Sequence, residues 1–221
     1  MIWFFKNGIC YDYLLNQEIS NDLTKRFYNS VYENSTEMEL WFALEYMKKN
    51  NINKLSVVFP IDELSVQYGD QQDFDKTYCD ENNILYRYER RQGGCLVLFP
   101  NNILTLDIRP VEEQQIVRNF EGDFALFLQN KGLEVDIDKN DILVDNKKIV
   151  GQVAFPLPSP CEGLLYFGTQ ISINSDSELI DKICTKPMNK VPGALIDYGI
   201  TTSEVMNWML DWFNKNQHVI I

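Results

Sequence analysis

The sequence predicts an α+β fold in which mixed or antiparallel sheets are flanked by helices. Short apolar runs lie on either side of turn-forming residues, which is the pattern of β-hairpins. Other segments carry apolar residues at helical spacing. No repeat, low-complexity run or Gly/Ser linker divides the 221 residues, so the simplest interpretation is a single domain over 1–221.

The first half of the chain predicts one amphipathic helix and two buried strands. Thr36-x-x-Glu39 has the form of a capping box, which opens a helix. The residues that follow place an apolar stripe on one face of that helix, formed by Leu40, Trp41, Leu44 and Met47. The runs 54–59 and 65–68 are typical of buried strands, because Pro60 and Gly69 end them.

The middle of the chain predicts a hairpin followed by a long helix. The apolar runs 95–99 and 103–108 flank Pro100-Asn101-Asn102, which is a turn-forming sequence. The segment 112–131 carries apolar residues at helical spacing, and Gly132 is expected to cap its end.

A second hairpin is predicted where Asp145-Asn146 separates the runs 142–144 and 147–154. Strand alternation would place Lys148, Val150 and Gln152 on one face of the second run, with Ile149 and Val153 on the other.

The last part of the chain predicts a strand over 164–174 and a short helix over 175–184. Thr201-x-x-Glu204 is another capping box, which opens a final helix. The apolar face of this helix contains Val205, Trp208, Met209 and Trp212.

Composition excludes several classes of function. The net charge of -12 disfavours nucleic acid as a partner, because binding phosphates needs a basic face. No run approaches the ~20 apolar residues of a membrane helix, and the first residues lack a signal peptide, so we expect a cytoplasmic protein with no membrane contact. Five cysteines without C-x-x-C spacing indicate reduced thiols, and the single histidine excludes a His-rich metal site.

Two groups of residues have the chemistry of a binding site. In Arg90-Arg91-Gln92-Gly93-Gly94, glycines allow backbone N–H groups close to a ligand and arginines supply forked donors for carboxylate or phosphate. The alternative is a bend with surface arginines. The second group is Asn140-Asp141 with Lys147-Lys148. A lysine held on a strand, here Lys148, is a well-placed point charge for an anion. The alternative is a solvated pair of lysines beside a turn.

The order and spacing of these groups resemble the lipoate–protein ligase family, which shares its fold with biotin–protein ligases and octanoyltransferases. The resemblance covers roughly the last two-thirds of the chain. Its matching segments are Gly69-x-x-Gln72, Arg90 to Phe99, Asn140-Asp141 with Lys148-Ile149-x-Gly151, Phe167-Gly168-Thr169, and the helix after Asp176.

The resemblance implies an enzyme that activates lipoate or octanoate with ATP and transfers the acyl group to a lysine of a lipoyl-carrier protein domain. It implies that Lys148 is the central catalytic residue. It places substrate and nucleotide on Gln72, Arg90, Arg91, Gly93, Gly94, Asn140, Asp141, Gly151, Gly168 and Thr169. Asp141 is further expected to help hold Mg²⁺.

The sequence departs from the family pattern at three positions. Cys95 replaces the third glycine of the loop, and Phe99 and Phe167 replace two histidines. Two alternatives follow. One is an ATP-independent acyltransferase that carries the acyl group as a thioester, with Cys184 as the nucleophile, and the other is a non-catalytic binding module on the same fold.

Overall fold

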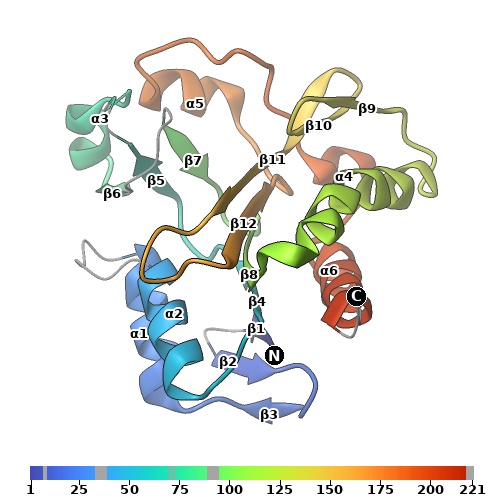
Figure 1. Ribbon diagram of the computed structural model, residues 1–221. Helices are drawn as coiled ribbons and strands as arrows, with labels where there is room; N and C mark the ends of the chain where they lie inside the picture. The colour runs from blue at the N-terminus through green and yellow to red at the C-terminus, as the bar shows by residue number, and fades with distance from the viewer. Residues whose placement is uncertain (7–8, 33–38, 70, 72, 89–94, 218–221) are drawn as a thin grey trace.

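The computed structural model describes residues 1–6, 9–32, 39–69, 71, 73–88 and 95–217, with side chains except at 27–41. Within these ranges the backbone forms a nine-stranded sheet and a three-stranded sheet, with helices packed on both (Figure 1). The α+β prediction is confirmed. In sheet order the large sheet contains β3 (Gln17–Glu18), β2 (Ile9–Asp12), β1 (Ile2–Lys6), β4 (Leu55–Pro60), β8 (Ile103–Pro110), β12 (Leu164–Ile171), β11 (Lys147–Pro156), β10 (Asp141–Val144) and β9 (Val135–Asp138).

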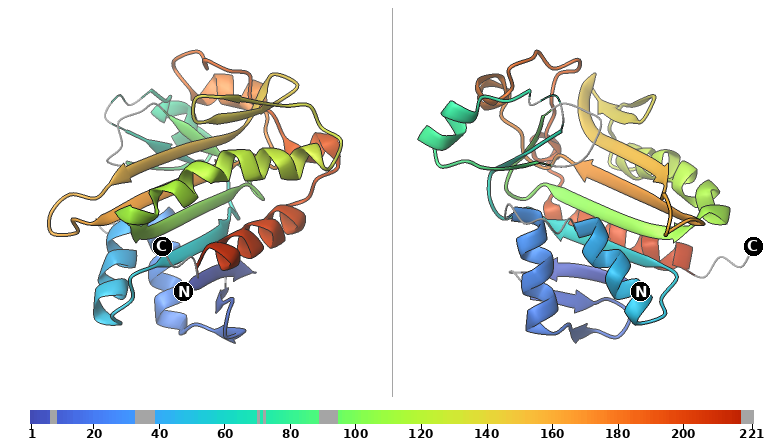
Figure 2. Two further views of the ribbon diagram at one scale, coloured as in Figure 1. Left: turned by 45° about the vertical axis from the view of Figure 1, so that its right-hand side comes forward. Right: turned by 60° about the vertical axis from the view of Figure 1, so that its left-hand side comes forward.

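The large sheet is antiparallel except between β1 and β4, which run parallel. One face is covered by α4 (Gln114–Gln129), which follows the short 3-10 helix η1 (Val111–Glu113), and by α6 (Thr202–Gln217). Figure 2 shows α4 and α6 along the same side of the sheet. Phe120 and Phe124 of α4 pack there against Trp212 of α6 and strand residues. Burial of this aromatic core is the main favourable contribution on this side.

The opposite face is covered in part by α1 (Asn21–Tyr32) and α2 (Glu39–Lys49). Phe42 and Met47 of α2 pack against Trp3, Val57 and Phe59 of the sheet. Residues of β8, β12 and β11 on this part of the face share a cavity with residues of β7, which belongs to the three-stranded sheet.

The three-stranded sheet has the order β6 (Leu85–Tyr88), β5 (Ser65–Tyr68) and β7 (Leu96–Leu98). It packs with α3 (Lys76–Glu81) and α5 (Ser177–Ile183) in a separate apolar cluster that includes Val66, Cys79 and Ile183. A further 3-10 helix, η2 (Leu195–Tyr198), precedes α6.

The hairpin predicted from the runs 95–99 and 103–108 is wrong. β7 pairs with β5 in the small sheet, whereas β8 belongs to the large sheet. The bend between them carries Asn101 at a φ of 72°. The side-chain oxygen of Asn102 accepts hydrogen bonds from the backbone N–H groups of Ile173 and Asn174, at 2.9 and 2.8 Å. These hydrogen bonds hold the bend against the segment after β12. The chain therefore passes from the small sheet to the large sheet at this bend.

The second predicted hairpin is confirmed as β10–β11. Asp145 and Asn146 have φ values of 49° and 62°, and positive φ at both positions is the signature of a tight hairpin turn. The helices predicted over 112–131 and from 201 correspond to α4 and α6. The capping box at Thr36 lies outside the described residues. No helix in the described ranges is long and apolar enough to cross a lipid bilayer.

Candidate functional site

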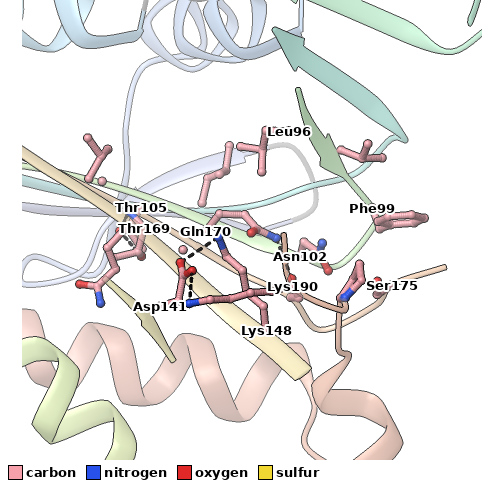
Figure 3. Close-up of a pocket in the computed structure, with 18 of the residues that line it drawn as sticks. Leu96, Phe99, Asn102, Thr105, Asp141, Lys148, Thr169, Gln170, Ser175 and Lys190 are labelled. Atoms are coloured by element: carbon pink, nitrogen blue, oxygen red, sulfur yellow. Dashed lines mark hydrogen bonds and ion pairs between the residues drawn. The ribbon is translucent and has the colours of Figure 1, made fainter. Parts of the chain in front are cut away.

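A cavity of about 1020 Å³ lies between the open face of the large sheet and the small sheet. Its floor comes from β4, β8, β11 and β12, and part of its wall comes from Leu96 and Val97 of β7. Figure 3 shows Lys148, Asp141 and Lys190 grouped together, with Leu96 and Phe99 on β7 and at its end. Polar and apolar side chains thus share one cavity.

The strand register orders the cavity floor from polar to apolar. Residues directly opposite each other on neighbouring strands project to the same face. Across β10, β11, β12, β8 and β4, one such row reads Asp141, Gly151, Gln170, Leu104 and Phe59. The floor therefore changes from a charged end at β10 to a hydrocarbon end at β4.

The next row on the same face is apolar throughout. It contains Val153, Gly168, Leu106 and Val57. Gly168 matters here because the hydroxyl oxygen of Tyr166 lies 2.6 Å from where a Cβ of residue 168 would be. A larger residue would have to displace the Tyr166 ring, so this glycine lets an aromatic side chain fold over the floor of the cavity.

Lys148 reaches the cavity because of an irregularity in β11. The register with β10 shifts between Ile142, which faces Val150, and Leu143, which faces Lys148. Ile149 and Val150 are both fully buried in the core under α4 and α6. The predicted alternation is wrong at this point, because a bulge adds one residue and turns Lys148 to the face of Gly151 and Val153. Gln152 points the other way and donates to Glu121 of α4 at 3.2 Å.

The ammonium group of Lys148 lies over Gly151. Its Nζ and Cε are each 3.2 Å from the position that a Cβ of residue 151 would occupy. Lys148 Nζ also lies 2.8 Å from Oδ1 of Asp141. Lys148, Asp141 and Gly151, which the sequence singled out, therefore meet at one point.

A second lysine, Lys190, completes this charged end. Lys190 Nζ lies 2.8 Å from Oδ2 of Asp141 and 2.8 Å from Oδ2 of Asp138. No sequence pattern predicts Lys190 as a site residue, since the segment between α5 and η2 has neither strand nor helical periodicity. Its contact with Asp141 joins residues 49 positions apart, and no local pattern marks such a contact.

Burial acts to raise the pKa of Asp141, but hydrogen bonds from Lys148 and Lys190 outweigh it and hold this pKa below its ordinary value. Hydrogen bonds to Asp138 and Asp141 raise the pKa of Lys190. Asp141 does not fit the expected Mg²⁺, because an ammonium group already lies on each of its oxygens. The described residues contain no group of three or more potential metal ligands.

Of the other predicted site residues, two line the cavity, one lies in an exposed turn, and the rest lie outside the described residues. Gly168 and Thr169 line the cavity, and the hydroxyl of Thr169 hydrogen-bonds to that of Thr105 at 2.7 Å. Asn140 is exposed in the β9–β10 turn. The remaining predicted positions, Gln72, Arg90, Arg91, Gly93 and Gly94, lie outside the described residues.

Cys184, the alternative nucleophile, ends α5 and does not line the cavity. Its thiol interacts with that of Cys95, which does line it. The hydrogen bond from Cys95 lowers the pKa of Cys184, and the same contact together with burial raises the pKa of Cys95. The two thiols form a partly buried pair at the side of the cavity.

Comparison with solved structures shows which proteins share this fold. A putative lipoate protein ligase from T. acidophilum with bound lipoic acid is 13% identical, with a TM-score of 0.63 over 99% of this chain and 86% of that chain. A lipoate-protein ligase A bound with ATP is 15% identical, with a TM-score of 0.63 over 90% and 81%. A third structure is 14% identical, with a TM-score of 0.61 over 90% of this chain and 80% of that chain. It comes from a structural analysis of a bi-partite lipoate protein ligase and its E2 lipoyl domain from T. acidophilum.

No protein-family model matches the sequence, and a search of curated proteins found no match. The structural likeness at these identities therefore concerns the fold. The chain has the α+β fold of lipoate–protein ligase catalytic domains.

Proposed function

We propose that this protein activates lipoate, or a similar acid such as octanoate, with ATP and transfers the acyl group to a lysine of a lipoyl-carrier protein domain. The observation that carries the proposal is that one cavity contains both Lys148, a lysine on a strand, and an apolar floor. It is supported by the shared fold, since proteins with this fold have bound lipoic acid and ATP.

The two ends of the cavity match the two ends of such an acid. The apolar chain would lie along Leu104, Leu106 and Phe59 under the β7 wall, where hydrocarbon is removed from water. The carboxylate would then extend toward Gln170 and Lys148. An amphipathic substrate is thereby oriented by its own polarity, with its reactive end at the cation.

The first step brings two anionic groups together. A carboxylate oxygen attacks the α-phosphorus of ATP, a bond from that oxygen to phosphorus forms, and pyrophosphate leaves. Two unit charges ~4 Å apart repel by about 4 kcal/mol at an effective dielectric near 20. Lys148 offsets this repulsion, and its effect grows as negative charge accumulates on the α-phosphate oxygens in the transition state.

The remaining predicted residues belong to the nucleotide in this proposal. Backbone N–H groups of Gly93 and Gly94, with Arg90 and Arg91, are assigned to the phosphates, and Gln72 to binding of the substrate or nucleotide. In the second step the amine of the carrier lysine attacks the acyl carbonyl, and AMP leaves. Holding the reactants together lowers the barrier by removing their translational freedom.

The first prediction tests Lys148 against its neighbour. Lys148→Ala should abolish lipoate-dependent exchange of pyrophosphate into ATP, because the cation at the reacting centre is lost. Lys147→Ala is the matched control, since Lys147 is the adjacent lysine and its side chain is exposed. Circular dichroism establishes that both variants fold.

Unchanged exchange in Lys148→Ala would remove this residue from the mechanism. A parallel incubation with a carrier domain, analysed by mass spectrometry, reports the second step. The expected product is an acyl group on a carrier lysine that requires ATP. A stable acyl adduct on Cys184 formed without ATP would instead favour the thioester route.

A further inference from the structure

The backbone of Lys148 is held by residues 190–193, called here the 190–193 segment. The N–H of Lys148 donates to the carbonyl oxygen of Val191 at 2.8 Å, and the carbonyl oxygen of Lys148 accepts from the N–H of Gly193 at 2.9 Å. Both backbone hydrogen-bonding groups of one functional residue thus bind the same short segment. Lys148 cannot shift along β11 without breaking this pairing.

The 190–193 segment approaches β11 too closely for a side chain at position 193. A Cβ on Gly193 would lie 2.7 Å from Cδ1 of Ile149 and 2.8 Å from Cβ of Lys147. Glycine is therefore required for the close passage of the two backbones. The position of the 190–193 segment against β11 therefore fixes the point from which the side chain of Lys190 projects.

Lys190 also reaches Lys148 through a shared carboxylate. Asp141 binds Lys148 with Oδ1 and Lys190 with Oδ2, each at 2.8 Å (Figure 3). Both oxygens of Asp141 are therefore fixed, which leaves this carboxylate one orientation. Lys190 is anchored in turn by Asp138.

We propose that Lys190 is a positioning residue, which fixes Asp141 and thereby aims the ammonium group of Lys148 into the cavity. The consequence for catalysis rests on the function proposed above, whereas the restraint on Asp141 is a property of the folded chain. Lys190 itself need not touch the substrate.

The physical reason is the flexibility of the groups involved. A lysine side chain has about 2 kcal/mol of rotamer entropy to lose when it is held in place. Asp141, fixed at both oxygens, supplies a rigid acceptor for Lys148. Without Lys190, the carboxylate is free to rotate, and Lys148 would sample positions away from the reacting atoms, where small misplacements reduce rates strongly.

Three variants test this role. Lys190→Met removes the charge and keeps the hydrocarbon stem, and Lys190→Arg keeps a cation. Lys186→Met is the matched control, because Lys186 lies in the same connection and binds a different carboxylate, Asp73, at 2.7 Å. Circular dichroism confirms folding of each variant.

The first measurement is the titration of the Asp141 side-chain carboxyl by ¹³C NMR, which needs no substrate. The charged groups around Asp141 are Lys148 from β11, Lys190, and Asp138 at the end of β9, and Lys139 of the β9–β10 turn in turn acts on Asp138. Loss of Lys190 removes one of the two lysines that lower the pKa of Asp141. The midpoint should therefore move to higher pH in Lys190→Met, and stay near the wild-type value in Lys190→Arg and Lys186→Met.

The second measurement is kcat/KM for lipoate-dependent pyrophosphate exchange. A misplacement of about 1 Å in a reacting group can cost roughly 100-fold, so Lys190→Met should lower kcat/KM by roughly 10- to 100-fold. Lys190→Arg should recover most of the activity. An unchanged Asp141 midpoint in Lys190→Met, or an unchanged kcat/KM, overturns the proposal. Absence of exchange in the wild-type protein would instead reject the proposed function, and the titration would still decide whether Lys190 restrains Asp141.

Discussion

At the scale of single residues, the charged end of the cavity depends on a glycine as much as on its charged groups. Gly151 carries no side chain where the amine of Lys148 lies, and any Cβ there would be 3.2 Å from Lys148 Cε and Nζ. This separation is closer than ordinary van der Waals contact. The absence of a side chain at Gly151 therefore leaves the space that the ammonium group of Lys148 occupies.

Under the proposed function, Gly151→Ala should therefore weaken binding of lipoate without unfolding the protein. The added methyl group forces Lys148 aside by a few tenths of an ångström, and we expect the affinity for lipoate to fall roughly tenfold. Isothermal titration calorimetry measures this change. Gly122→Ala is the control, since nothing lies within 4 Å of its Cβ position in α4. The control should keep its affinity and gain about 0.5–1 kcal/mol of stability, because alanine favours helix more than glycine. Equal affinities in the two variants would contradict this account of Gly151.

At the scale of elements, local chemistry explains which predictions succeeded. The Asp145-Asn146 turn was predictable, because both residues tolerate positive φ and the strands beside them are apolar. The bulge in β11 was not, because Ile149 and Val150 are both drawn into the core by helices far along the chain. Lys190 was missed for a related reason, since its carboxylate partners lie on β9 and β10.

The same distinction explains the wrong hairpin at 95–108. The turn residues were identified correctly, but turn chemistry does not specify which sheet receives the next strand. Asn102 binds the backbone after β12, a partner about 70 positions away, and this contact directs the chain. Sequence patterns therefore predicted where strands end better than which strands pair.

The start of α6 is an element whose stability should depend on pH. Thr201 and Glu204 cap it reciprocally, with the Glu204 carboxylate accepting from the N–H of Thr201 at 3.0 Å. Lys131 adds an ion pair at 2.7 Å. Hydrogen bonds from Lys131 and Thr201 lower the pKa of Glu204 to about 2 from an ordinary 4.5.

Glu204→Gln should lower the urea midpoint of unfolding at neutral pH. The folded-state pKa is depressed, so the stabilisation from Glu204 is complete above about pH 4.5 and disappears as the pH falls through about 2. The difference between wild type and Glu204→Gln should therefore shrink over this window. Lys131→Gln removes one of the two sources and should give a smaller difference with the same direction. A difference that stays constant from pH 6 to pH 2 would show that the charge of Glu204 contributes nothing.

At the scale of the whole molecule, a buried ionic cluster joins elements from both ends of the chain. Arg109 of β8 is 1% exposed and binds Asp107 and Glu113, and Glu113 also pairs with Lys54. Asp107 accepts a hydrogen bond from Ser56 of β4, whose hydroxyl in turn accepts one from Gln217 of α6. The cluster thus links the centre of the large sheet to the helices that cover it, on the side away from the cavity.

Arg109→Ala should lower the free energy of unfolding by about 3–5 kcal/mol, because it leaves the buried carboxylate of Asp107 without its counter-charge, whereas Glu113 keeps Lys54. Urea denaturation followed by tryptophan fluorescence measures the loss. Arg118→Ala is the control, since Arg118 is exposed on α4 and its change should stay within about 0.5 kcal/mol. Because the cluster and the cavity share no residue, the proposed function implies that Arg109→Ala protein that remains folded at low temperature has the wild-type affinity for lipoate. A loss of affinity under those conditions would mean that the cluster also shapes the cavity floor through β8, which supplies Leu104 and Leu106.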